Sequence, residues 1–325
     1  MGGDFGPSVT CPALAQVLAQ SPDLHLMLFG RQQAFDQHQS LFKPYASRVV
    51  FSVCEDEVTM DEKPSHALRH KQQSSMYRAV QAVANGKAQA CVSAGNTGAL
   101  MAISRFVIKT LPGIDRPPVC SQMPTETDSC LMLDLGANVD CKPEHLRQFA
   151  IMGSEMAKIL YQNPRPRVAL LNVGEEQLKG NELVQEAASL LSKEANLHYT
   201  GFVEGDDIYQ GKADVIVCDG FVGNAVLKAS EGVARLVRAR IKQTFTESFL
   251  LRTVAALAKP AMQQMFQRID PSRYNGATFL GLQGVVVVSH GKTDISGFAN
   301  AVKLAYEQVK LDLPGKIQLQ LSSVP

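Results

Sequence analysis

The chain has 325 residues, of which 45% are hydrophobic and 19% are charged, and its formal net charge is +1. This ordinary globular balance excludes a disordered chain, and the near-neutral charge gives no sign of a nucleic-acid binder. No apolar run approaches the ~20 residues of a membrane span, and a glycine-rich turn stands where a signal peptide would begin. We therefore expect a cytoplasmic protein that touches a membrane only peripherally.

Short apolar runs alternate with segments of helical spacing along most of the chain. This alternation predicts an α/β fold with a mostly parallel sheet covered by helices on both faces. The expected strands are residues 24–29, 49–53, 88–92, 129–133, 168–171, 198–202, 214–217 and 285–288, and the clearest helices are residues 74–83 and 182–191.

The first residues, Gly2-Gly3-Asp4-Phe5-Gly6-Pro7, have the composition of a turn that follows a strand, yet no strand precedes them. Either the natural start lies upstream or the sheet lacks one element. We favour the upstream start.

Residues 233–268 depart from the alternation and predict helices over 233–245 and 248–258, with a break at Pro260. Their apolar residues fit a helix that packs on its own domain or on a second subunit, or a surface that touches lipid. No linker divides the chain, so we expect a single domain over residues 1–325 with a helical excursion at about 233–268.

The chain carries seven cysteines and no CxxC pair. Several lie inside apolar runs, which indicates reduced, buried thiols rather than disulfides or zinc ligands. A nucleophilic cysteine is the alternative, but no histidine signature accompanies any of them. The cysteines are Cys11, Cys54, Cys91, Cys120, Cys130, Cys141 and Cys218.

Ligands of open parallel sheets bind beyond the carboxyl ends of the strands, where helix N-termini present free N–H groups. Two turns of this kind echo each other, SAGNTGALM from residue 93 and DGFVGNAVLK from residue 219. Glycines allow the backbone to approach an anion, and the polar side chains add donors. Tight turns with N-cap residues are the alternative. The candidate residues are Ser93, Gly95, Asn96, Thr97, Gly98, Asp219, Gly220, Gly223 and Asn224.

Two further turns follow strands. The turn from Asp134 to Asn138 is dense in acids and amides, which suits either an ordinary turn or a polar site. The turn that ends in Lys179, Gly180 and Asn181 places a lysine where it could reach an anionic ligand, although a lone lysine is often a solvated surface group.

Two late clusters complete the candidates. Asn275 lies in a Tyr-Asn-Gly-Ala sequence that is a polar site or only a turn before a buried helix. His290 follows the β-branched strand, where it is a structural hydrogen-bonding group, a general acid or an anion contact. No dinucleotide or P-loop fingerprint and no metal-ligand spacing occurs, so we expect no metal, nucleotide or other cofactor.

Taken together, several stretches resemble the phosphate acyltransferase family of fatty acid and phospholipid synthesis (PlsX). They are MGGDFGP at 1, SAGNTGALM at 93, DLGANVD at 134, FAIMGS at 149, LLNVGEEQLKGN at 170, DVIVCDGFVGNAVLK at 214 and YNGATFLGL at 274. The resemblance implies a three-layer αβα fold similar to isocitrate and isopropylmalate dehydrogenases, and a homodimer with a projecting helical element. Members of the family carry a strand before MGGD, which this chain does not contain.

The resemblance also implies an enzyme that passes an acyl group from acyl-acyl carrier protein to inorganic phosphate. A membrane-bound glycerol-3-phosphate acyltransferase would use the product. Lys179, Asn181, Asp219 and His290 are then the expected catalytic residues, and the other candidates bind phosphate or substrate. The acidic carrier protein needs a basic patch, for which Arg165, Arg167, Arg235, Arg238 and Arg240 are candidates.

Two other functions remain open from sequence. A decarboxylating 2-hydroxy-acid dehydrogenase of the same fold would need NAD or NADP and clustered aspartates for Mg²⁺. A non-catalytic membrane tether or carrier-protein scaffold would use only the helical excursion.

Overall fold

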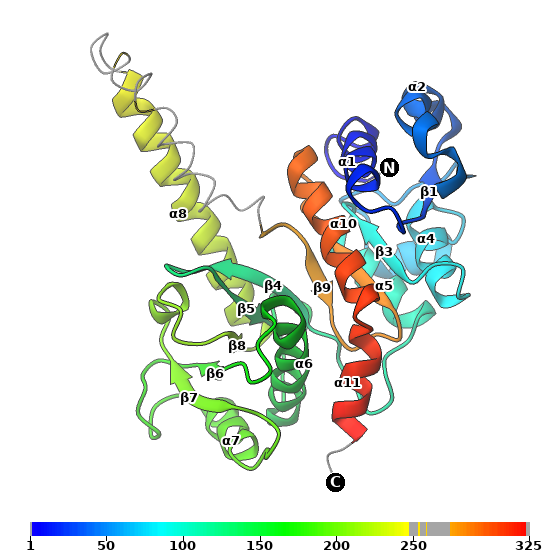
Figure 1. The fold of residues 1–325 in the computed structure, drawn as a ribbon. Coiled ribbons are helices and arrows are strands. Elements are labelled where there is room, and N and C mark those ends of the chain that lie inside the picture. The colour runs from blue at the N-terminus through cyan, green and yellow to red at the C-terminus, as the bar shows by residue number, and fades with distance from the viewer. Residues whose placement is uncertain (1, 247–252, 254–257, 259–273, 323–325) are drawn as a thin grey trace.

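The computed structural model describes residues 2–246, 253, 258 and 274–322. Its helices lie on both faces of a central sheet (Figure 1). The strands are β1 Leu26–Gly30, β2 Val49–Val53, β3 Ala90–Ser93, β4 Val119–Pro124, β5 Ser129–Leu133, β6 Val168–Leu171, β7 Tyr199–Val203, β8 Val215–Val217, β9 Ala277–Phe279 and β10 Val285–Val288. The α-helices are α1 Pro7–Gln20, α2 Gln32–Phe42, α3 Pro64–His70, α4 Ser75–Ala84, α5 Thr97–Val107, α6 Pro143–Tyr161, α7 Glu182–Leu191, α8 Gly220–Thr246, α10 Ile295–Lys310 and α11 Leu313–Ser322, and the 3-10 helices are η1 Lys43–Arg48 and η2 Asp207–Tyr209.

The main sheet has eight strands in the order β3-β10-β9-β4-β5-β8-β6-β7. β3 and β10 are parallel to each other, and so are β5, β8, β6 and β7. β9 pairs antiparallel with β10 and β4, and β4 pairs antiparallel with β5. The two parallel groups therefore run in opposite directions. The sequence did not predict β4 or β9, and the helix considered after Asn275 is wrong, because β9 begins at Ala277.

Alternating side chains of the strands enter separate cores on the two faces of the sheet. In β10, Val286 and Val288 pack in the core that contains α4 and α5 residues. Val285 and Val287 pack on the opposite face against Ala301 of α10. Because both faces are covered by helices, the predicted three-layer αβα architecture is confirmed.

Helix α6 lies unusually close to the sheet at Gly153. A Cβ atom at this position would lie 2.7 Å from Val215 Cγ1 and 3.0 Å from Leu133 Cδ2. Glycine thus permits the helix backbone to pack directly on β5 and β8, beneath the loops that end these strands.

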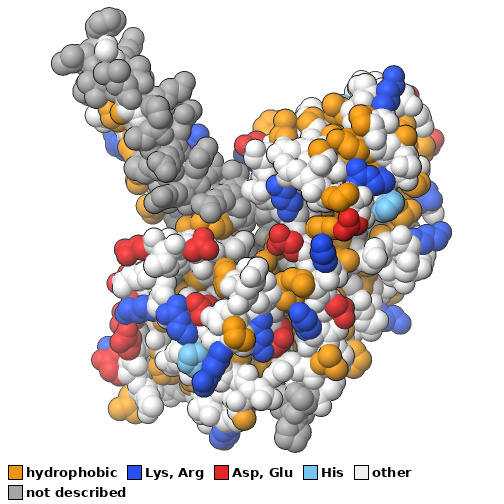
Figure 2. Space-filling model, in the orientation of Figure 1, with side chains coloured by type: hydrophobic (Ala, Val, Ile, Leu, Met, Phe, Trp, Pro, Cys, Tyr) orange, Lys and Arg blue, Asp and Glu red, His pale blue; other side chains and the backbone are white. Residues whose placement is uncertain are grey.

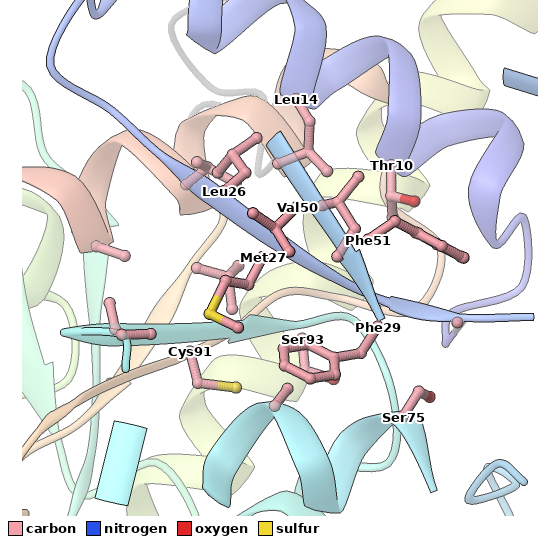
Figure 3. Close-up of a pocket in the computed structure, with 18 of the residues that line it drawn as sticks. Thr10, Leu14, Leu26, Met27, Phe29, Val50, Phe51, Ser75, Cys91 and Ser93 are labelled. Atoms are coloured by element: carbon pink, nitrogen blue, oxygen red, sulfur yellow. The ribbon is translucent and has the colours of Figure 1, made fainter. Parts of the chain in front are cut away.

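β1 and β2 form a separate two-stranded parallel sheet rather than continuing the main one. A cavity of about 620 Å³ lies between β1 and β3. Leu26 and Phe29 of β1 line it together with Cys91 and Ser93 of β3 (Figure 3). The upstream strand considered from the sequence stays a prediction.

Helix α8 begins directly after β8 and projects away from the rest of the molecule (Figures 1 and 2). The helix expected at 233–245 is confirmed as part of α8, whereas 248–258 and Pro260 lie mostly or wholly outside the described residues. Val233, Leu236 and Val237 on the projecting part are 60%, 58% and 44% exposed. Within the described ranges, no helix has the length and apolar character needed to cross a bilayer.

Two helical glycines provide a matched test of this packing. We expect Gly153→Ala to lower the free energy of unfolding by about 1–3 kcal/mol, because its methyl group would overpack the β5–β8 face. Gly232→Ala in α8 has no neighbour within 4 Å of the added atom and should change stability little, or raise it by up to about 1 kcal/mol. Urea unfolding measures both variants, and equal losses would contradict the close approach of α6.

Candidate active site

The loop between β3 and α5 is held by Asn96. Its side-chain oxygen accepts a hydrogen bond from the Ala99 amide at 3.0 Å, which caps α5. Its Nδ2 donates to the carbonyls of Thr59, Met60 and Glu62 at 2.9–3.2 Å. Asn96 is buried and its polar atoms bond to protein groups, so it shapes the loop. Its contact with a ligand stays a prediction.

The rest of this loop offers free donors. Ser93 Oγ accepts from the Gly95 amide at 3.2 Å. A Cβ at Gly95 would lie 2.7 Å from Met76 Cε, so the flexible end of that methionine would have to shift. Thr97 and Gly98 are exposed, and their amides have no acceptor among the residues that the structure describes. These amides start an 11-residue helix, where the peptide dipoles favour an anion.

Asn275 organises the loop after β10. Its Nδ2 donates to Ser289 Oγ at 2.7 Å, to Thr293 Oγ1 at 3.1 Å and to the Gly297 carbonyl at 2.8 Å. Its Oδ1 accepts from the His290 amide at 2.9 Å. Because Asn275 is buried, these bonds fix the backbone that carries His290.

The loops after β3 and β10 are neighbours. The Ser289 amide donates to the Ser93 carbonyl at 2.8 Å, and the Asp4 amide donates to the Gly291 carbonyl at 2.7 Å. The structure therefore brings Ser93, the start of α5 and His290 to the same end of the parallel pair β3 and β10.

Asp134 shapes the loop after β5. Its Oδ1 accepts from the amides of Val119, Gly136 and Ala137 at 2.8–3.2 Å. Its Oδ2 accepts from the Asn138 amide at 2.6 Å and from Asn138 Nδ2 at 2.9 Å. Burial raises the pKa of Asp134 above its usual value, and the N–H donors oppose this rise. All five donors are protein groups, so Asp134 holds its own loop together.

The turn at the start of α8 is also internally satisfied. The Gly220 amide donates to the Asn138 carbonyl at 2.8 Å, the amides of residues 221–222 donate to Asp219 Oδ1 at 2.9 and 3.0 Å, and the Gly223 amide donates to the Asp219 carbonyl. The expectation that this turn offers free amides to phosphate is therefore not met. The glycines are needed for close packing, since a Cβ on Gly223 would lie 1.9 Å from the Asp134 carbonyl oxygen.

Helix α8 connects this turn to the β10 loop. Asn224 is exposed and lies against Gly136. Lys228 and Glu231 follow it at spacings of four and three residues, which places them along the same side of the helix. Glu231 Oε1 lies 3.8 Å from His290 Nε2. The sequence analysis missed Lys228 and Glu231, although helical spacing from Asn224 could have indicated them.

The loop between β6 and α7 lies apart from these groups. Lys179 Nζ lies 2.8 Å from Glu176 Oε2, and this exposed partner raises the pKa of Lys179. Asn181 Oδ1 accepts from the Val184 amide at 3.0 Å and caps α7. Within the described residues, no hydrogen bond or ion pair joins Lys179 or Asn181 to the β3, β10 or α8 groups.

Sheet topology explains this separation. β3 and β6 are six places apart in the strand order and run in opposite directions. At about 4.8 Å per strand, β3 and β6 are separated by on the order of 29 Å across the sheet. Because they run in opposite directions, their carboxyl ends also lie at opposite ends of the strands. The roles assigned to Lys179 and Asn181 stay predictions, and they do not share contacts with the start of α5.

The thiols are poor nucleophiles. All seven cysteines are free, and five of them are buried. Burial raises the pKa of Cys91 and of Cys130 to about 12 and that of Cys141 to about 11. The thiolate is the reactive form, so the predicted buried thiols fit a structural role. In the described part of the chain, no three His, Cys, Asp or Glu residues gather as metal ligands would.

Comparison with known proteins identifies the family. The profile of the family described as "Fatty acid synthesis protein" matches residues 1–316. The phosphate acyltransferase of Pseudomonas fluorescens Pf-5 is 50% identical over 325 residues, covering 100% of this chain and 96% of that protein. The phosphate acyltransferase of Stutzerimonas stutzeri is 50% identical over 323 residues, covering 99% and 90%. The chain belongs to this family, as the sequence stretches predicted.

Solved structures are similar in fold. A phosphotransacetylase from Streptococcus pyogenes superposes with a TM-score of 0.62 at 16% identity, over 94% of this chain and 93% of that one. A branched-chain phosphotransacylase from Enterococcus faecalis gives a TM-score of 0.57 at 16% identity, over 95% and 96%. At this identity the similarity supports the three-layer fold alone.

Asp134 offers a test of the loop architecture. Three N–H donors point at Oδ1 of Asp134 and two point at Oδ2. In Asp134→Asn the NH₂ group replaces one of these oxygens, so in either orientation it would face at least two N–H donors. We expect a loss of about 2–4 kcal/mol in the free energy of unfolding, because buried donors lose their acceptor. Asp140→Asn, an exposed position in the same loop, is the control for urea unfolding. Equal stability of the two variants would show that the Asp134 network is dispensable.

Proposed function

We propose that the protein transfers a fatty acyl group from acyl-acyl carrier protein to inorganic phosphate, giving acyl phosphate and free carrier protein. Membership of the family makes it an acyltransferase of fatty acid and phospholipid synthesis. The name phosphate acyltransferase, carried by relatives that are 50% identical over the whole chain, supports phosphate as the acceptor.

The reaction requires two things of a site. It must hold a phosphate dianion against a thioester carbonyl, and it must stabilise the negative charge that develops on the carbonyl oxygen. The observation that carries the proposal is the pair of amides of Thr97 and Gly98, which lack protein acceptors in the described chain and begin α5 beside the β10 loop. Backbone N–H groups are uncharged dipoles that do not titrate near neutral pH, so they can bind an anion at any such pH.

Scaffolding residues keep these amides in place. Asn96 ties the loop to residues 59–62, and Asn275 ties the neighbouring His290 backbone. We assign Ser93, Gly95 and these two asparagines to the frame of the phosphate site, with Thr97 and Gly98 as its donors. Asp134, Asn138, Gly220 and Gly223 belong to the frame that positions α8 and Asn224.

The carrier protein is acidic, so it needs a basic surface. Arg235, Arg238 and Arg240 lie on the projecting part of α8, which makes this helix the best candidate. Arg167 is less suitable, because its ion pair with Asp214 at 2.8 Å is closer than that of Arg235 with Glu231 at 3.5 Å. Arg165, which lies just before β6, stays a candidate.

The exposed apolar residues of α8 support contact with a second subunit or with lipid. We therefore propose a homodimer in the cytoplasm, able to associate peripherally with the inner face of the membrane. There it would pass acyl phosphate to a membrane-bound glycerol-3-phosphate acyltransferase.

The activity can be tested directly. The protein should convert palmitoyl-acyl carrier protein and phosphate to acyl phosphate, which hydroxylamine traps as palmitoyl hydroxamate. The reaction should depend on phosphate and need no added metal or nucleotide. If hydroxamate forms equally without phosphate, or does not form at all, the proposed function is wrong.

Lys179 is the second test. If Lys179 neutralises phosphate or the oxyanion, Lys179→Ala should lower kcat/KM about ten-fold or more. The thermal midpoint should barely change, because Lys179 and Glu176 are both exposed. Full turnover of Lys179→Ala at saturating phosphate would remove this residue from the site.

A further inference from the structure

Glu231 lies at the centre of a small charged group in which only His290 was among the predicted site residues. Its carboxylate is only 16% exposed, although it is on the surface of the projecting helix. Lys228 Nζ lies 3.2 Å from each of its oxygens, Arg235 Nη1 lies 3.5 Å from Oε2, and His290 Nε2 lies 3.8 Å from Oε1. One largely buried carboxylate thus faces two cations and an imidazole.

The charges of this group do not cancel. Lys228 and Arg235 each carry one positive charge and Glu231 carries one negative charge, so with a neutral His290 the group has a net charge of +1. Lys228 is still half exposed, and among the residues that the structure describes its Nζ has no partner other than Glu231, which leaves it N–H donors to spare. A cation that a buried carboxylate orients, while one side stays open, is suited to bind an anion.

The position of the group also matters. Asn275 fixes the His290 backbone, and the His290 loop bonds to the β3 loop that leads to Thr97 and Gly98. The group therefore lies beside the helix start assigned to phosphate. Lys179 has no such link in the described chain.

We propose that Lys228 and His290 are catalytic residues of the phosphate acyltransferase reaction and that Glu231 is the residue that positions them. Lys228 contacts the phosphate, and His290 Nε2 moves its proton. This inference rests on the proposed function and adds named roles to it.

An oxygen of HPO₄²⁻ attacks the thioester carbon, a C–O bond forms, and the C–S bond breaks with its electron pair leaving on sulfur. The proton of the attacking phosphate passes to His290 Nε2 and from there to the carrier thiolate. The products are acyl phosphate and the carrier thiol, and neither an oxidant nor a metal is consumed.

His290 suits this role when it is neutral. Burial lowers the pKa of His290, the negative charge of Glu231 opposes this effect, and the positive charge of Lys228 adds to it. The imidazole is still 51% exposed, so it can reach a ligand. The other charged residues around it are Arg235 on α8, Asp4 at the start of the chain, and Lys292 and Asp294 on its own loop.

The experiment measures acyl phosphate formation against phosphate concentration and pH for five variants, one of them a control, and for the unchanged protein. Lys228→Met should raise the KM for phosphate about 10–100-fold, because a charge-assisted contact is lost. Lys228→Arg should recover part of it. His290→Gln should lower kcat about 100-fold or more.

The pH profiles distinguish a chemical role from a structural one. Activity should fall as the pH drops and His290 becomes protonated. Lys228→Met should move this fall to higher pH, because the cation that lowers the pKa of His290 is gone, and Glu231→Gln should move it to lower pH. Phosphate titrates identically in every sample, so differences between variants report on the protein.

Lys158→Met is the matched control. Lys158 and Glu155 form an ion pair at the same i,i+3 spacing on α6, with a similarly buried carboxylate. This variant should keep the KM and the pH profile. Circular dichroism melting identifies any variant that fails to fold, and NMR titration of the His290 ring in folded Lys228→Met and Glu231→Gln measures the opposed pKa shifts without turnover.

The outcomes separate the two proposals. If the unchanged protein forms no acyl phosphate, the proposed function fails, whatever the variants do. If it is active, and folded Lys228→Met keeps its KM or both pH profiles coincide with that of the unchanged protein, the roles of Lys228, Glu231 and His290 are overturned.

Discussion

The antiparallel strands β4 and β9 determine how this protein assembles a site. They lie between two groups of parallel strands and reverse the direction of the sheet. In a sheet of one direction, all loops after strands would meet at one edge. Here the loops after β3 and β10 lie at one edge, and those after β5, β8 and β6 lie at the other. A long helix that runs along the strands is needed to join groups at these two opposite ends of the strands.

Helix α8 is that element. It begins at the carboxyl end of β8, and eleven residues later Glu231 meets His290 at the carboxyl end of β10. With a rise of 1.5 Å per residue, this part of the helix spans about 16 Å, comparable to the length of a strand. The internal hydrogen bonds of Asp134 and Asp219 anchor the first turn. The polar turn at 134–138 therefore fixes the direction of α8. In our proposal, this is how the turn positions Glu231 and Lys228 in the site.

The sequence predicted the fold class, eight of the ten strands and the family, because continuous short apolar runs and distinctive loop stretches are local signals. It missed β4, which includes Cys120, Ser121 and Gln122, since this strand lacks a continuous apolar run. It missed β9 because three residues are too few to show a period. Without these strands the reversal of direction cannot be inferred, so the sequence gives no sign that the loops after β3 and β6 lie at opposite ends of the strands.

The polar loop residues present a related difficulty. Asn96, Asn138 and Asn275 have the composition of ligand contacts, yet the structure uses their amides for several internal bonds each. Sequence alone cannot tell a scaffold asparagine from a binding one, because both need donors at the end of a strand. Three residues keep N–H donors without a protein acceptor in the described chain: Thr97, Gly98 and Lys228. Only the structure distinguishes them from the scaffold residues.

The surroundings of Cys91 and Ser93 indicate how the acyl group is transferred. A covalent acyl-enzyme would need an activated nucleophile close to the start of α5. Cys91 precedes this loop by two residues, but burial raises its pKa to about 12, which leaves almost no thiolate near neutral pH. Ser93 Oγ accepts a hydrogen bond from the Gly95 amide, and no imidazole contacts this hydroxyl within the described residues. Direct attack by phosphate needs neither group, and it needs only that the anion be held and relieved of one proton. In our proposal, the Thr97 and Gly98 amides, Lys228 and a neutral His290 would meet those requirements.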